Sequence, residues 1–351
     1  MKNDISIDGR LIGLNEPVYI IAEMSANHLQ NYDRAKAIIK EAKEAGADAI
    51  KLQTYTPDTL TLNCHTSEFL ATPGSPWEGT NLYDLYKEAY TPWDWHNGLI
   101  DYAREIGITC FSSPFDFSAV DFLEKLDVPA YKIASFEIVD IPLIKRVAQC
   151  GKPIIISTGI ADVTDIQLAL DACLEVGNDQ VILLKCVSEY PTPYAELNLA
   201  TIPNMHETFS CITGLSDHSM GSAVPIAAVS LGACVIEKHF TLKRSDGGPD
   251  GSFSMEPHEF AMMVEDIRNV KKALGTVMYT LTEKQKKSRE RGRSLYVSCD
   301  INKGDVFSQN NIRSVRPGYG LHPKYFERIL GKRSKCNLKM GDALKWEYIE
   351  L

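Results

Sequence analysis

The chain has 351 residues, of which 44% are hydrophobic and 24% are charged, as is typical of a soluble globular protein of two domains. Lysine and arginine total 37 against 46 aspartate and glutamate residues, and the net charge of −9 argues against a nucleic-acid-binding protein. No apolar run approaches the roughly 18–20 residues of a membrane-spanning helix. The polar first residues also predict no signal peptide.

The chain up to about residue 275 repeats one pattern: a short β-branched or aromatic run ends in a polar residue, and a longer helical stretch follows. Helical patterns such as 32–44 and 119–126 lie between the runs, and Gly46, Gly107 and Gly232 are predicted to cap helix ends. Eight runs are predicted strands: 18–23, 49–53, 109–113, 130–133, 153–157, 181–186, 212–216 and 235–239.

Eight βα units in about 250 residues match the size of a (β/α)8 TIM barrel. The alternative is a doubly wound open sheet, in which the chemistry gathers at one switch point. Here a polar residue ends almost every run, and this favours a barrel whose site is built from the carboxyl ends of all the strands. The predicted barrel domain covers residues 1–280.

The remaining residues form two further predicted segments. Residues 281–293 are charged and have no apolar face, so we interpret them as a linker. Residues 294–351 contain short strands and turns such as 302–305 and 316–320, which predict a small, mostly β domain. Because so small a core is marginal alone, we expect it to pack on a barrel, either its own or a neighbour's.

Nine cysteines are scattered through the chain, and none forms a CxxC pair. An odd number without such pairs predicts reduced thiols, several of them buried in strands. Reduced thiols are typical of the cytoplasm, which is the location that the sequence predicts.

Lysines and hydroxyl groups recur at the predicted strand ends. Two lysines and a ring of hydroxyls at one barrel mouth suit a phosphorylated ligand, because the ammonium groups supply charge and the hydroxyls bind phosphate oxygens. A single serine is more often a helix N-cap, and a single lysine is as readily a strand-end salt bridge, so the prediction depends on these residues converging at one mouth. The candidates are Glu23, Ser25, Asn27, His28, Lys51, Gln53, Ser112, Ser113, Lys132, Ser135, Glu137, Ser157, Thr158, Lys185, Ser188, Tyr190, Ser216, Asp217, His218, Glu237, Lys238 and His239.

His218 and His239 end the last two predicted strands, and with nearby carboxylates they could hold a divalent metal that keeps open positions. The alternative for each histidine is a satisfied polar residue or a general acid or base. Oxygen-rich neighbours and the expected lack of a thiolate favour Mn²⁺ or Mg²⁺ over structural zinc. A Schiff-base aldolase is the competing enzyme hypothesis, and it needs a desolvated lysine at a strand end. Its candidates are Lys51, Lys132, Lys185 and Lys238.

Ordered motifs occur along nearly the whole chain. They are AEMSANH (22–28), AIKLQ (49–53), SSPFD (112–116), KIASFE (132–137), ISTG (156–159), LSDHS (215–219) and IEKHF (236–240). Together they resemble the sialic acid synthase family, whose members condense phosphoenolpyruvate with an amino sugar. The tail, with NKGD (302–305) and RPGYGL (316–321), is similar to the antifreeze-like (SAF) domain of that family.

Within the family, three phrases are most similar to the pseudaminic acid synthases: residues 82–90, 135–144 and 184–191. Sialic acid synthases typically carry Asn where this chain has Ser188, and they differ after Glu137, which argues against N-acetylmannosamine as the substrate. The resemblance implies condensation of phosphoenolpyruvate and water with 2,4-diacetamido-2,4,6-trideoxy-L-altrose. The alternatives are the same reaction giving N-acetylneuraminic or legionaminic acid, and a non-catalytic sugar-binding barrel.

The resemblance also implies roles for individual residues. His218 and His239 would bind a divalent metal, Mn²⁺ first, with Mg²⁺ and Co²⁺ as alternatives. Residues with catalytic roles would be Glu23, Lys51, Lys132, Glu137 and His239. Phosphoenolpyruvate would be held by Lys51, Ser113, Lys132, Ser135, Ser157, Ser188 and Ser216. The sugar would be contacted by Glu23, Tyr190, Asp250 and Arg316.

The resemblance finally implies an assembly. Family members form domain-swapped homodimers, so Arg316 of one protomer would close over the sugar in its partner's barrel. No nucleic-acid or membrane partner is expected.

Overall fold

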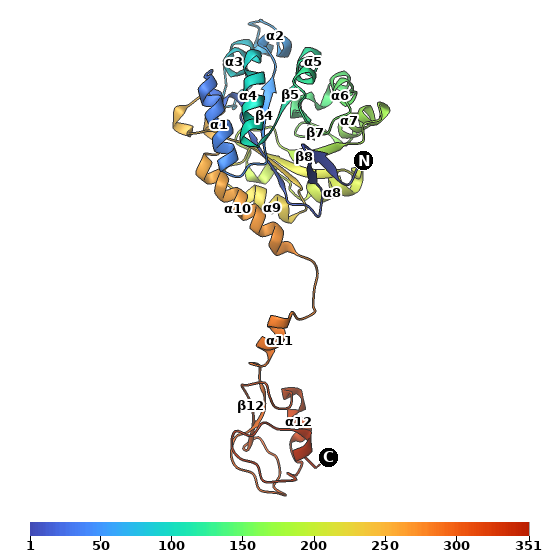
Figure 1. The fold of residues 1–351 in the computed structure, drawn as a ribbon, viewed down its shortest axis with the longest axis vertical. Coiled ribbons are helices and arrows are strands. Elements are labelled where there is room, and N and C mark those ends of the chain that lie inside the picture. The colour runs from blue at the N-terminus through green and yellow to red at the C-terminus, as the bar shows by residue number, and fades with distance from the viewer. Residues whose placement is uncertain (351) are drawn as a thin grey trace. The chain divides into compact units, whose positions relative to one another are not determined.

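A computed structural model describes residues 1–350 of the chain, and residue 351, the last of the predicted C-terminal domain, lies outside the described residues. The chain divides into two compact units (Figure 1), the first covering Met1–Gly275 and the second beginning at Thr276. Within residues 1–350, no helix combines the length and apolar character needed to cross a membrane.

The first unit is a closed barrel of eight parallel strands, in which each strand pairs with the next and β10 pairs back with β3. This confirms the predicted TIM barrel and excludes the open sheet. Nearly every residue of these strands is buried, on both faces, because side chains fill the interior and helices cover the outside. Each strand lies within one residue of its predicted bounds: β3 (Tyr19–Glu23), β4 (Ala49–Thr54), β5 (Thr109–Pro114), β6 (Tyr131–Ile133), β7 (Ile154–Ser157), β8 (Val181–Cys186), β9 (Ile212–Asp217) and β10 (Val235–His239).

One longer helix follows each barrel strand and packs outside the barrel (Figure 1). Predicted helix ends are confirmed at Gly46, Gly107 and Gly232, whose φ angles of 89°, 74° and 99° are positive, as glycine readily allows. The helices are α1 (Tyr32–Glu44), α4 (Trp93–Ile106), α5 (Phe117–Lys125), α6 (Ile141–Ala148), α7 (Val163–Glu175), α8 (Thr201–Phe209), α9 (Ala223–Ser230) and α10 (Pro257–Leu274).

Two features of the first unit were not predicted. Strands β1 (Ile5–Ile7) and β2 (Arg10–Ile12) form an antiparallel hairpin, and Ile5, Ile7 and Ile12 join the barrel core. The Asp8 carboxylate accepts a hydrogen bond from Thr109 at the start of β5, which places the hairpin at the amino-terminal end of the barrel. A long segment between β4 and α4 also contains two additional helices, α2 (Pro57–Leu60) and α3 (Leu82–Ala89).

The second unit contains an antiparallel pair, β11 (Ser294–Val297) and β12 (Ile312–Val315), and a short helix, α12 (Phe326–Ile329). This confirms the small, mostly β C-terminal domain. The segment predicted as a linker, 281–293, contains helix α11 (Glu283–Arg289), which buries no residue. The core of the unit is Leu295, Val297, Ile301, Phe307, Ile312, Ile329, Leu338, Leu344 and Ile349.

Candidate active site

A polar cavity opens at the carboxyl ends of the barrel strands. Its lining residues come from strand ends far apart in the sequence, which the closed barrel brings to one place. They are Glu23, Lys51, Gln53, Lys132, Ala134, Ser135, Ser157, Cys186, Tyr190, Ser216, His218, Glu237 and His239. A larger cavity, of about 660 Å³, lies near the amino ends of β5 and β7, between Cys110 and Lys152, and holds none of the predicted site residues.

The alternation of side chains along each strand decides which candidate lysines reach the cavity. Lys51 and Lys132 line it, at 4% and 2% exposure. Lys238 is buried elsewhere, donating to Asp217 and to the backbone oxygen of Ser219, and Lys185 donates to the backbone oxygen of Cys186. Only two of the four Schiff-base candidates therefore lie in the cavity, and both are paired with carboxylates.

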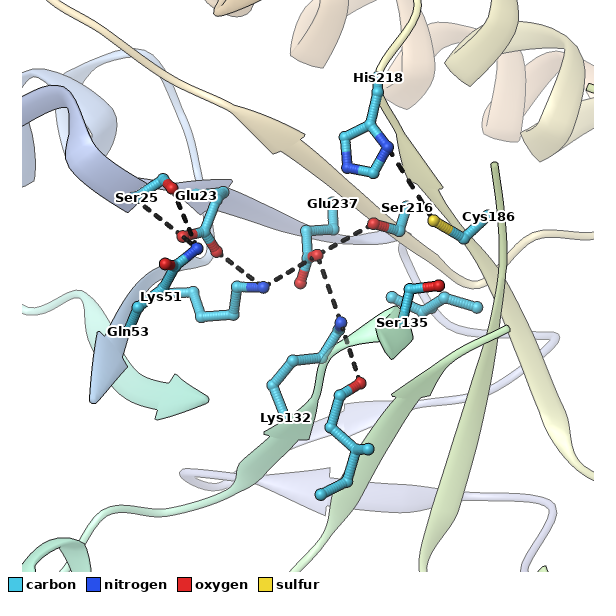
Figure 2. A network of polar contacts seen from close by, with 12 residues as sticks. Glu23, Ser25, Lys51, Gln53, Lys132, Ser135, Cys186, Ser216, His218 and Glu237 are labelled. Carbon is cyan, nitrogen blue, oxygen red and sulfur yellow. Dashed lines mark hydrogen bonds and ion pairs between the residues drawn. The ribbon is translucent and has the colours of Figure 1, made fainter. Parts of the chain in front are cut away.

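Carboxylates and ammonium groups alternate across the cavity (Figure 2). Lys51 Nζ lies 2.7 Å from Glu23 Oε2 and 3.0 Å from Glu237 Oε1, and Lys132 Nζ lies 3.6 Å from Glu237 Oε1. Desolvation lowers the pKa of Lys51 to about 7, while Glu237 opposes that shift. Burial favours the neutral form of Glu237, yet the lysines outweigh it and hold the pKa of that carboxyl well below its usual range.

Several buried polar atoms at this mouth have no hydrogen-bond partner in the described part of the chain. They include Ser113 Oγ, Ser157 Oγ, Glu137 Oε2 and His239 Nδ1. Buried polar groups in proteins are almost always paired, so unpaired atoms gathered at one mouth indicate that a polar ligand completes them.

Ser135 and Ser188 lie side by side, with Ser188 Oγ donating to Ser135 Oγ over 2.8 Å. A Cβ atom added to Gly159 would come within 2.3 Å of Ser188 Oγ and 2.5 Å of Ser135 Oγ. The positions of these two hydroxyls therefore depend on a glycine, because any side chain at residue 159 would push them aside.

His218 and His239 lie on adjacent strand ends, with ring centroids 5.4 Å apart. His218 Nδ1 lies 2.9 Å from the backbone oxygen of Val187. Because a carbonyl oxygen only accepts, Nδ1 is the donor in this contact, and Nε2 of the neutral ring keeps its electron pair free. Among residues 1–350, no three His, Cys, Asp or Glu side chains are grouped to hold a metal. Two imidazoles with a free ring nitrogen each fit a metal whose other ligands are water and substrate.

Three of the four predicted sugar contacts lie in the first unit. Glu23 Oε1 accepts from the backbone nitrogen of Ser25 at 2.9 Å, and Asp250 accepts from the hydroxyl of the same serine. The ring of Tyr190 lies 4.2 Å from that of His218. Arg316, by contrast, lies in the second unit, directly after β12.

Glu137 follows β6 in a short 3-10 helix, Ser135–Val139, and its side chain is half-buried. Burial raises its pKa to about 7, although Lys132 and Lys51 act in the opposite direction. Its carboxyl group therefore faces the same two cations as the predicted phosphate.

Cys186 is a residue that the sequence analysis did not place in the site. Its thiol sulfur lies 4.0 Å from His218 Nδ1, so a thiol lies beside a histidine for which the sequence predicts no thiolate neighbour. The sequence predicts Lys185 as the polar end of this strand, but strand alternation turns Cys186 inward and Lys185 away. The same alternation explains why residues two apart on one strand both line the cavity, as Lys51 and Gln53 do on β4 and Glu237 and His239 do on β10.

Comparisons with known proteins show which family the chain is similar to. A family described as the NeuB family matches residues 38–279, and the SAF domain matches residues 292–350. A pseudaminic acid synthase from Campylobacter jejuni is 47% identical over 94% of this chain and 96% of its own. An N,N'-diacetyllegionaminic acid synthase from Legionella pneumophila is 36% identical over 96% of both. A solved spore coat polysaccharide biosynthesis protein from Bacillus subtilis has a TM-score of 0.67, with 34% identity over 99% of both chains.

Proposed function

This chain belongs to the NeuB family, and we propose that it is a pseudaminic acid synthase. It joins carbon 3 of phosphoenolpyruvate to the aldehyde carbon of 2,4-diacetamido-2,4,6-trideoxy-L-altrose. Water then adds at carbon 2, its proton passes to the new alkoxide, and inorganic phosphate leaves. The observation that carries the proposal is the buried pair Lys51 and Lys132 at the mouth of a barrel. The greater identity to the Campylobacter enzyme than to the Legionella enzyme supports the choice of sugar.

Phosphoenolpyruvate carries several negative charges, and the two buried ammonium groups are assigned to its phosphate. The unpaired hydroxyls of Ser113 and Ser157, with Ser135, Ser188 and Ser216, are assigned to its remaining oxygens. These groups are buried and fixed in place, so they need little reorganisation as charge moves onto the departing phosphate.

His218 and His239 are assigned to a divalent metal, which we propose to be Mn²⁺, with Mg²⁺ and Co²⁺ as alternatives. Their free ring nitrogens suit such an ion, with water and substrate as its other ligands. Lewis-acid polarisation of the sugar's aldehyde oxygen is the chemistry that a bound cation supplies there.

Two carboxyl groups are assigned to the reacting carbon atoms. Positive charge develops at carbon 2 of phosphoenolpyruvate when carbon 3 attacks, and Glu137, whose Oε2 is buried and unpaired, would stabilise that charge. Glu23, held by the backbone nitrogen of Ser25 and by Gln53, would position the reacting end of the sugar. Tyr190 and Asp250 are assigned to the rest of the sugar.

The assembly and the location are parts of the same proposal. We propose a domain-swapped homodimer, in which Arg316 of one protomer closes over the sugar in its partner's barrel. We also propose that the enzyme works in the cytoplasm, as its reduced cysteines favour.

The test is Mn²⁺-dependent release of phosphate from phosphoenolpyruvate, with EDTA as the control. We expect turnover with 2,4-diacetamido-2,4,6-trideoxy-L-altrose and much less with N-acetylmannosamine or with the legionaminic acid precursor. Turnover of one of the latter sugars alone would keep the mechanism and overturn the choice of substrate. No phosphate release with any amino sugar would favour a non-catalytic sugar-binding barrel.

A further inference from the structure

Glu237 has contacts in the cavity that none of the roles assigned above explains. It lies on β10, two residues before His239, and is 4% exposed. Its Oε1 atom is the shared partner of Lys51 Nζ at 3.0 Å, Lys132 Nζ at 3.6 Å and Ser216 Oγ, which donates over 3.1 Å (Figure 2). Its Oε2 atom is buried without a hydrogen-bond partner among residues 1–350. One carboxylate oxygen thus forms ion pairs with both lysines of the cavity.

These three donors are the same groups that are assigned to phosphoenolpyruvate. Two converging ammonium groups in a buried site repel each other and lose hydration, so they need an anion between them. Glu237 supplies that anion in this structure. A phosphate that approaches the same donors meets a carboxylate of like charge, so the two anions compete for Lys51 and Lys132.

We propose that Glu237 is an internal anion, which holds Lys51 and Lys132 in place before a phosphorylated substrate binds and is displaced from them when it does. The inference rests on the proposed function, because it takes the lysine pair as the phosphate site. Glu237 is a positioning residue that acts through the lysines. Its return to them also helps the product phosphate to leave.

The test compares the unmodified enzyme with Glu237→Gln, which keeps the shape of the side chain and its acceptance from Ser216 but removes its charge. Binding of phosphoenolpyruvate and of inorganic phosphate is measured by isothermal titration calorimetry, without sugar. We expect both to bind about tenfold more tightly, the scale of one lost charge-assisted contact. In steady-state kinetics, Glu237→Gln should have a lower KM for phosphoenolpyruvate than the unmodified enzyme. Its kcat should also be lower, because the product phosphate leaves more slowly.

A purely structural role predicts the opposite, because misplaced lysines would weaken both ligands. Equal or weaker binding by a folded Glu237→Gln variant, as judged by circular dichroism, would therefore overturn the inference. Asp250→Asn is the matched control. It also removes a buried carboxylate at the mouth, but one that contacts Ser25 and Ala26 instead of a lysine. Phosphate affinity should change little in this control, and an equal gain in both variants would contradict displacement.

A second measurement needs no variant. In a crystal structure of the unmodified enzyme with phosphoenolpyruvate, ligand oxygens should contact both lysines and the Glu237 carboxylate should have left Lys51 and Lys132. Retention of the Glu237 contacts would overturn the inference. If the unmodified enzyme turns over and only this displacement fails, the proposed function stands. If it binds neither phosphoenolpyruvate nor phosphate, both fail together.

Discussion

At the scale of single residues, Lys132 is the cation on which the proposed phosphate site depends most. It is 2% exposed and has one carboxylate partner, Glu237, whereas Lys51 has two. Lys132→Ala should lower kcat/KM for phosphoenolpyruvate by about 10²–10³-fold, because a preorganised donor to the departing phosphate is lost. The assay is phosphate release, with circular dichroism to confirm the fold. Lys125→Ala, on the exposed face of α5, is the control. Near-normal turnover of Lys132→Ala would remove the residue from the mechanism.

Glu137 gives a pH-dependent prediction. Its pKa is raised by burial to about 7 from an ordinary 4.5, so the folded chain favours the neutral carboxyl and ionisation opposes folding. The penalty is absent below pH 4.5 and grows until the pH exceeds about 7. Relative to wild type, Glu137→Gln should therefore gain stability as the pH rises from 5 to 8, by on the order of 2 kcal/mol for a half-buried group.

The measurement is the difference in melting temperature between Glu137→Gln and the unmodified chain at several pH values. A control at Glu175, exposed at the end of α7, should show no such trend on replacement by Gln. A constant difference across this range would show that Glu137 titrates normally.

Much of the candidate site could be predicted from residue types at strand ends, because a barrel brings every carboxyl end to one mouth. The sequence could not tell which of two neighbouring polar residues faces inward. A strand alternates, and a shift of one residue exchanges Lys185 for Cys186. Nor could it show that Glu237 pairs with Lys51 and Lys132, since that contact joins three strands.

At the scale of elements, His218 directly follows β9 and His239 ends β10, and a buried ion pair joins these strands. Lys238 and Asp217 are 1% and 0% exposed in their side chains, on neighbouring strands that pair Lys238 with Asp217 in register. Lys238→Met leaves Asp217 charged and unpaired, which should cost about 3–5 kcal/mol of unfolding free energy in urea. Adding Asp217→Asn should recover most of it, because no buried charge remains. A loss below about 1 kcal/mol for the single variant would contradict this role.

The strands and helices of the barrel were predictable because their hydrophobic patterns are strong and their ends carry glycine caps. The β1–β2 hairpin was missed because each strand has only three residues and the polar positions around them hide the pattern. Its turn, Asp8 and Gly9 with φ of 50° and 76°, is nevertheless a recognisable hairpin signal. The helices α2 and α3 lie in an insertion that no barrel rule anticipates.

At the scale of the whole molecule, exposed apolar side chains gather on one arc of the barrel mouth. Phe117, Phe136 and Val163 are 51%, 57% and 63% exposed, and they follow the successive strands β5, β6 and β7. Single exposed apolar residues are ordinary, but a group on neighbouring elements is typical of an interface. Since the family resemblance implies homodimers, we expect a second copy of the chain to cover this arc.

The proposed homodimer predicts a sedimentation mass of about twice the 39.1 kDa of one chain. Phe136→Glu should shift the equilibrium towards the monomer, because dimerisation would then bury a carboxylate without a partner. Met262→Glu is the matched control, since Met262 is 55% exposed on α10, outside the barrel, and should leave the mass unchanged. Sedimentation velocity over a range of concentrations distinguishes these outcomes. A monomeric unmodified chain would contradict the homodimer itself, whereas a dimer that is unaffected by Phe136→Glu would place its interface elsewhere.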